Sequence, residues 1–71
     1  MNIMAHRYIG ADPKVQVGKA IIKGTRVPVE LVVGKIAGGM TIAEVMHEYD
    51  LTRAQVQAAL RYAGELVNKL F

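Results

Sequence analysis

Cysteine, serine and tryptophan are absent from the 71-residue sequence, and histidine occurs only twice. Without cysteine the chain has no disulfide and no thiolate, and without serine a second common nucleophile is missing. His6 and His47 stand far apart, and neither has carboxylates around it at the spacing of a metal site. Because the acids are scattered as well, we expect a protein that is not an enzyme and that has no metal or cofactor.

Long apolar runs are also missing. No stretch comes near the ~20 residues that a membrane span needs, and the first residues lack the apolar core of a signal peptide. The lack of cysteine fits a reducing compartment. We therefore expect a soluble cytoplasmic protein without a membrane partner.

Apolar residues nevertheless make up 52% of the chain. A single domain of this length buries only about 60% of the surface that it exposes when unfolded. Small folds without disulfides or metals often gain stability by association. The composition therefore predicts a homodimer.

The net charge of +3 is unevenly distributed. Up to Val29, five cations accompany a single acid, Asp12, whereas from Glu30 onward acids exceed cations by one. A phosphate-binding surface would therefore come mainly from the N-terminal third. On charge alone, the alternative is a solvated surface that keeps the protein in solution.

Two capping boxes stand eleven residues apart. Thr41 is followed three residues later by Glu44, and Thr52 by Gln55, so each threonine hydroxyl can accept a hydrogen bond at a helix start. Apolar residues after both caps recur at the spacing of a helix face. Because only a three- or four-residue turn fits between these helices, residues 41 to 63 are predicted to form a helix-turn-helix.

An earlier helix is predicted from Val29 to Ala37. Pro28 suits its first position, where a missing N–H is harmless, and Gly38-Gly39 suits its end. Gly34 is unfavourable inside a helix by roughly 1 kcal/mol relative to alanine, so we expect it to permit the close approach of another backbone. The predicted buried face comprises Val29, Val32, Val33, Ile36 and Ala37.

Short extended segments precede this helix. Tyr8-Ile9 and Ala20-Ile21-Ile22 are predicted strands, Gly10 to Pro13 a turn, and the alternation of Val15 and Val17 leaves two or three strands open. Such a ribbon needs the helices or a second chain against it. The predicted fold is one mainly α domain: an N-terminal tail and β-ribbon (1–27), then a three-helix helix-turn-helix core (28–71).

The last helix, from Thr52 to about Leu70, would be about 28 Å long at ~1.5 Å per residue. Its final two turns extend past the other helices and carry apolar residues that those helices cannot cover. A second subunit would cover them. The predicted dimer interface consists of Leu66, Val67, Leu70 and Phe71.

The stretch IIKGTRVPVELVVGKIAGGMTIAEVMHEYDLTRAQVQAALRYAGEL resembles the bacterial and archaeal family called domain of unknown function 433. The resemblance runs from about Ile9 to Val67. Its most specific parts are Lys23 to Val29, Gly39-Met40-Thr41, Tyr49 with Leu51-Thr52, and Ala58-Ala59-Leu60 followed by Tyr62-Ala63. It implies a three-helix helix-turn-helix domain of the kind found in DNA-binding proteins. Family members that look like antitoxins are encoded beside toxins with a PIN-like nuclease fold. Ala20 departs from the family pattern, which often has proline after Gly-Lys.

If the chain binds DNA, the helix after Thr52 should enter the major groove. The predicted base-reading residues on its exposed face are Arg53, Gln57, Ala58 and Arg61. Predicted phosphate contacts from the ribbon are Lys19, Lys23 and Arg26. The simpler interpretation is that all of these belong to an ordinary solvated surface. For Gly24-Thr25-Arg26, we expect internal hydrogen bonds with the first helix rather than an anion cradle.

Two functions of different classes follow. The first is a dimeric DNA-binding regulator, the antitoxin and autorepressor of a toxin–antitoxin pair with a PIN-like toxin. The second is a protein-interaction module that masks a partner without binding DNA. Salt separates the two, because counterion release makes DNA binding steeply salt-dependent, whereas an apolar interface built on Leu70 and Phe71 depends little on salt.

Overall fold

The computed structural model of the protein describes residues 7–11 and 20–70, with only the backbone of Ala11, Lys69 and Leu70. Two short strands, β1 (Ile9–Ala11) and β2 (Ala20–Ile22), come first. Three helices follow: α2 (Val29–Ala37), α3 (Ile42–Tyr49) and α4 (Arg53–Leu70). The predicted fold class, three helices preceded by an antiparallel β-ribbon, is therefore confirmed.

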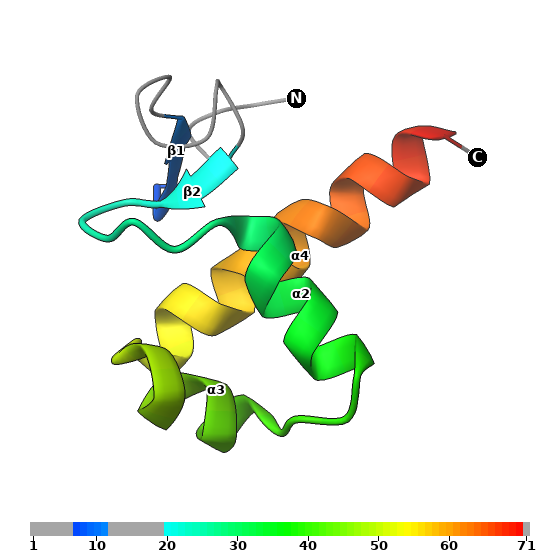
Figure 1. The fold of residues 1–71 in the computed structure, drawn as a ribbon. Coiled ribbons are helices and arrows are strands. Elements are labelled where there is room, and N and C mark those ends of the chain that lie inside the picture. Colours follow the sequence, from blue (N-terminus) through cyan, green and yellow to red (C-terminus); the bar gives the residue numbers. More distant parts are fainter. Residues whose placement is uncertain (1–6, 12–19, 71) are drawn as a thin grey trace.

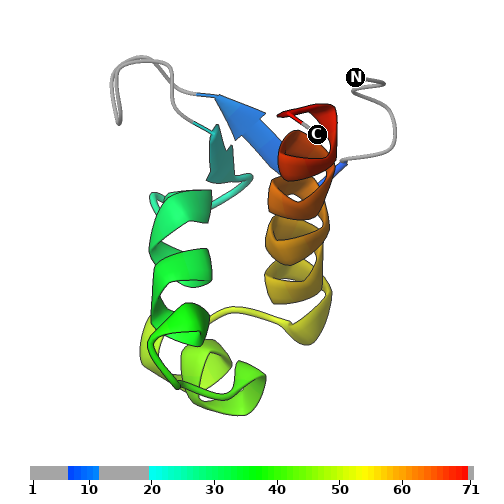
Figure 2. The same ribbon diagram turned by 90° about the vertical axis from the view of Figure 1, so that its right-hand side faces the viewer.

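The helices form a small angular bundle. In Figure 1, α2 crosses in front of α4, and α3 lies across the end of the bundle where α4 begins. The ribbon lies beyond the start of α2, and the last turns of α4 extend away from the other helices. Figure 2 shows the same arrangement from the side, with α2 and α4 running next to each other in opposite directions.

The ribbon pairs Ile9 with Ile22, Gly10 with Ile21 and Ala11 with Ala20 in antiparallel register. Gly10 and Ala11 therefore belong to β1, and their assignment to a turn was wrong. Glycine at position 10 leaves room for the side chain of Lys23, because a Cβ there would lie only 3.2 Å from Lys23 Cγ. The other residues predicted to form the turn or a third strand, from Asp12 to Val17, lie outside the described residues.

A hydrogen-bonded turn connects β2 to the first helix. The N–H of Thr25 donates to the carbonyl of Ile22 at 3.1 Å, and Gly24 takes the positive φ of +80° that such a turn requires. The Thr25 hydroxyl donates to the same carbonyl at 2.7 Å and accepts from the N–H of Val27 at 3.0 Å. Thr25 thus stabilises the junction itself, which corrects the expectation that it would bond to the first helix.

Helix α2 begins and ends where the sequence indicates. Pro28 precedes it with extended backbone angles, so the proline occupies the N-cap rather than the first helical position. The N–H of Gly38 closes the helix on the carbonyl of Gly34 at 2.9 Å, and the chain then turns through Gly39 at a φ of +113°. Ala37, predicted to be buried, is exposed because α2 diverges from α4 toward this end (Figure 1).

Both predicted capping boxes are present. The N–H of Glu44 donates to Thr41 Oγ1 at 3.1 Å, and the N–H of Thr41 donates to Glu44 Oε1 at 2.9 Å. Thr52 and Gln55 exchange the same pair of bonds, at 2.8 and 3.1 Å. Asp50 between the helices takes left-handed angles, with φ 55° and ψ 51°. This single left-handed residue lets α3 end and α4 begin within three residues.

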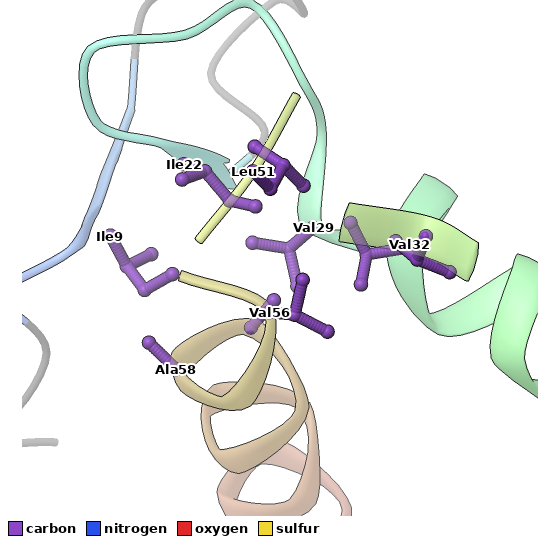
Figure 3. Close-up of a cluster of buried hydrophobic side chains, with 9 residues drawn as sticks. Ile9, Ile22, Val29, Val32, Leu51, Val56 and Ala58 are labelled. Atoms are coloured by element: carbon purple, nitrogen blue, oxygen red, sulfur yellow. The ribbon is translucent and has the colours of Figure 1, made fainter. Parts of the chain in front are cut away.

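The core is formed by aliphatic side chains from every element (Figure 3). Because each short element contributes only one to three of them, no element has an apolar face that is stable by itself. Among the described residues, no helix is long and apolar enough to cross a membrane. The residues of this buried cluster are Ile9, Ile22, Val29, Val32, Val45, Leu51, Val56, Ala58 and Ala59, and Ile21 is buried outside it.

Candidate nucleic-acid interface

One face of α4 carries a row of exposed polar side chains. Arg53, Gln57 and Arg61 follow each other at intervals of four residues and are all exposed. The opposite face is closed, because Val56 and Ala59 are fully buried among the helices. The helix therefore has the two-sided character that a groove-binding helix needs: packed behind and polar in front.

Ala58 does not belong to this exposed row. It is only 5% exposed and lies in the core next to Ile9 of β1, as Figure 3 shows. The prediction that Ala58 meets a base is therefore wrong, because the ribbon covers this side of α4. Ala54, one turn earlier, is exposed and is the small residue that remains beside the polar row.

Two of the three predicted phosphate contacts lie on the surface. Lys23 is exposed in the turn after β2, and Arg26 is exposed at the junction before α2. Lys19 lies outside the described residues. The described ribbon and junction, residues 7–11 and 20–28, carry three cations and no acid, and α4 carries no acid before Glu65. Ribbon and helix thus form the basic part of the described surface.

The acidic part lies mainly on α3 and at its end. Glu44 and Glu48 are exposed on this helix, and Asp50 follows in the turn. Acids next to the start of α4 repel phosphates on that side. Any approach of a polyanion to the polar row is therefore favoured from the side of the ribbon.

Arg7 and Tyr8 form a contact at the start of the ribbon that no sequence pattern predicts. The guanidinium carbon of Arg7 lies 5.2 Å from the centroid of the Tyr8 ring, and its Nη2 donates to the Tyr8 hydroxyl oxygen at 3.4 Å. Arg7 is exposed, while the ring of Tyr8 is half-buried against the core. The only sequence signal for this contact is an arginine directly before an aromatic residue at the start of a predicted strand.

A groove opens between α2 and the second half of α4. It has a volume of about 610 Å³ and is mainly apolar. Leu66 at its edge is 41% exposed, and the neighbouring Val67 is 50% exposed. The side chains of Leu70 and Phe71, the other predicted dimer contacts, lie outside the described part of the chain. The groove is lined by Ala20, Val29, Glu30, Val33, Gly34, Tyr62, Ala63 and Leu66.

Gly34 lies on the wall of this groove and faces open space. A Cβ at this position would meet no atom within 4 Å. The expectation that Gly34 admits another backbone is therefore not met by any described segment of its own chain. Over the same residues, no group of three histidine, cysteine or carboxylate side chains could hold a metal ion.

Comparisons with known proteins show similarity in both sequence and fold. The model of the family described as "Protein of unknown function (DUF433)" matches residues 9–63. The crystal structure of a DUF433 member from Anabaena variabilis is similar, with a TM-score of 0.80 and 29% identity over 94% of this chain and 67% of that one. Rv2018 from Mycobacterium tuberculosis has a TM-score of 0.66 and 31% identity over 73% of this chain. The matched region makes up only 24% of the mycobacterial chain. Among curated proteins, none matches the chain.

Proposed function

We propose that this chain, which belongs to the DUF433 family, is a DNA-binding protein that reads the major groove with α4. The observation that carries the proposal is the exposed row of Arg53, Gln57 and Arg61 on a helix whose other face is packed. Arginine can bind guanine O6 and N7 in a bidentate manner, and glutamine can bind adenine N6 and N7. Lys23 and Arg26, together with Lys19, would contact phosphates.

Alanine substitution of the two arginines tests the assignment. Arg53→Ala and Arg61→Ala should each weaken binding to the preferred duplex by roughly 5- to 150-fold, because a good bidentate pair is worth about 1–3 kcal/mol. Gel shift or fluorescence anisotropy with DNA from the chain's own promoter measures this change. Lys35→Ala is the matched control, since Lys35 is an exposed cation in the last turn of α2. Unchanged affinity in both arginine variants would remove α4 as the reading helix.

The regulatory part of the proposal is that the protein acts as an antitoxin and represses its own promoter. It is supported by the resemblance to family members that are encoded beside PIN-like toxins. The proposal requires a neighbouring gene for a small PIN-like nuclease whose toxicity is relieved by co-expression of this chain. A nuclease that stays toxic would leave a DNA-binding protein without this partner.

A protein-interaction module is the second candidate, and the apolar groove between α2 and α4 favours it. Partial exposure of Leu66 and Val67 beside a groove of this size is typical of a surface that another chain covers. A complex made there should persist at high salt. DNA binding should instead weaken, with a log–log slope near −0.9 for each phosphate contacted.

A further inference from the structure

Tyr8 and Lys23 stand opposite each other at one end of the ribbon. The N–H of Lys23 donates to the carbonyl of Tyr8 at 2.8 Å, which continues the register of β1 and β2 and sets these two residues opposite each other. Directly opposite residues of an antiparallel pair project to the same face. The stem of Lys23 crosses Gly10, where the absent side chain leaves room for it. Tyr8 and Lys23 are therefore held side by side.

Arg7 joins this pair through the Tyr8 ring. Its stacking on the ring, and its bond to the hydroxyl oxygen, restrict the guanidinium before any ligand arrives. Because the Tyr8 oxygen accepts from Arg7, the hydroxyl hydrogen points elsewhere and can be donated to another acceptor. Arg7 and Tyr8 thus offer a guanidinium and a hydroxyl donor next to Lys23, the residue opposite Tyr8 in the ribbon.

The start of β1 lies beside α4. Ile9 packs with Ala58 of α4 in the core, on the face of the strand away from Lys23, and Tyr8 is partly buried against the same core. Ala54 and Arg61, one turn before and after Ala58, are exposed on the flank next to it. Figure 2 shows β1 passing beside α4. The acids at the end of α3 lie near the start of α4, whereas the described ribbon and junction carry Arg7, Lys23 and Arg26 and no acid.

We propose that Arg7, Tyr8 and Lys23 form a phosphate-binding site that holds one backbone strand of a DNA duplex while α4 lies in its groove. The site rests on the proposed DNA-binding function. It adds Arg7 and Tyr8 to the proposed phosphate contacts and places one DNA backbone strand against the ribbon. Arginine supplies planar paired donors, lysine a point charge, and tyrosine a neutral donor between them. None of these contacts depends on base sequence.

The salt dependence of binding tests the site separately from base reading. Arg7→Gln and Lys23→Gln should each make the log–log slope of affinity against salt shallower by ~0.9, on a short fluorescent duplex of arbitrary sequence. Tyr8→Phe keeps the ring and removes the hydroxyl, so affinity should fall several-fold with an unchanged slope. Lys35→Gln is the control for loss of one positive charge away from the ribbon. Thermal unfolding verifies that each variant folds.

The possible outcomes distinguish the two proposals. If Arg53→Ala weakens operator binding but Arg7→Gln and Lys23→Gln keep the slope of Lys35→Gln, the ribbon site is wrong and base reading by α4 stands. If the unsubstituted chain binds no duplex even at low salt, both proposals fail. Shallower slopes for Arg7→Gln and Lys23→Gln, with a normal slope for Lys35→Gln, support the site.

Discussion

At the scale of single residues, the capping box of α3 ties a carboxylate to the helix start. The N–H of Thr41 donates to the Glu44 carboxylate, and this bond, followed by that of the Thr41 hydroxyl, lowers the pKa of Glu44 from its ordinary 4.5. A carboxyl whose pKa is lower in the folded than in the unfolded chain stabilises the fold above its unfolded pKa. That stabilisation is lost as the pH falls below about 4.5 and through the lowered pKa.

Glu44→Gln should therefore flatten the dependence of stability on pH in this acidic range. Glutamine keeps a side-chain oxygen for the Thr41 N–H but does not titrate. The free energy of unfolding, measured in urea from pH 6 down to pH 3, should fall less in Glu44→Gln than in the unsubstituted chain. Glu48→Gln removes a carboxylate of the same helix outside the capping box and should behave like the unsubstituted chain. Parallel curves for Glu44→Gln and the unsubstituted chain would contradict the argument.

Ala58 shows where prediction from sequence stops at this scale. Its position on α4 and its small size are compatible with an exposed face, and nothing within the helix indicates otherwise. Its burial depends on Ile9, which comes from the other end of the described chain. Thr41 and Thr52 were predictable because their partners lie three residues away. Residues whose surroundings are set by distant segments were not.

At the scale of elements, the helices were predictable and the ribbon only in part. Caps, a proline and a glycine pair lie within the chain next to the helix ends that they define, so the bounds of α2 agree with the sequence. The ends of β1 depend on its pairing with β2, and a glycine that reads as a turn residue is part of the strand. The register, in turn, creates the Tyr8–Lys23 pair, which no local pattern indicates.

Gly34→Ala tests why a glycine stands inside α2. With open space around the position, alanine should raise the free energy of unfolding by ~1 kcal/mol, because glycine is a poor helix former. Gly39→Ala is the opposing control, since its φ of +113° strains any other residue and should lower stability. Urea unfolding at several protein concentrations measures both. A gain that turns into a loss at high concentration would indicate that a second chain approaches Gly34.

At the scale of the whole molecule, α4 has two exposed sides of different chemistry, one polar and one apolar. The polar row of Arg53, Gln57 and Arg61 forms one side. On the other, Leu66 continues the apolar stripe of Ala59 and Ala63 past the point where α2 covers it. A second copy that lays its own final turns into the groove would cover Leu66 in both chains, as two-fold symmetry requires. Because the sides differ, such a dimer leaves the polar row free for DNA.

The chain should therefore sediment as a dimer at micromolar concentration, and Leu66→Gln should shift it toward monomer. A buried amide without a partner opposes association, whereas the exposed leucine contributes little to the fold of one chain. Arg61→Gln, on the polar side of the same helix, should leave sedimentation unchanged and weaken only DNA binding. If two half-sites are read together, Leu66→Gln should also reduce affinity for a paired operator but not for a single half-site. A clean monomer for the unsubstituted chain would exclude a second copy as the occupant of the groove.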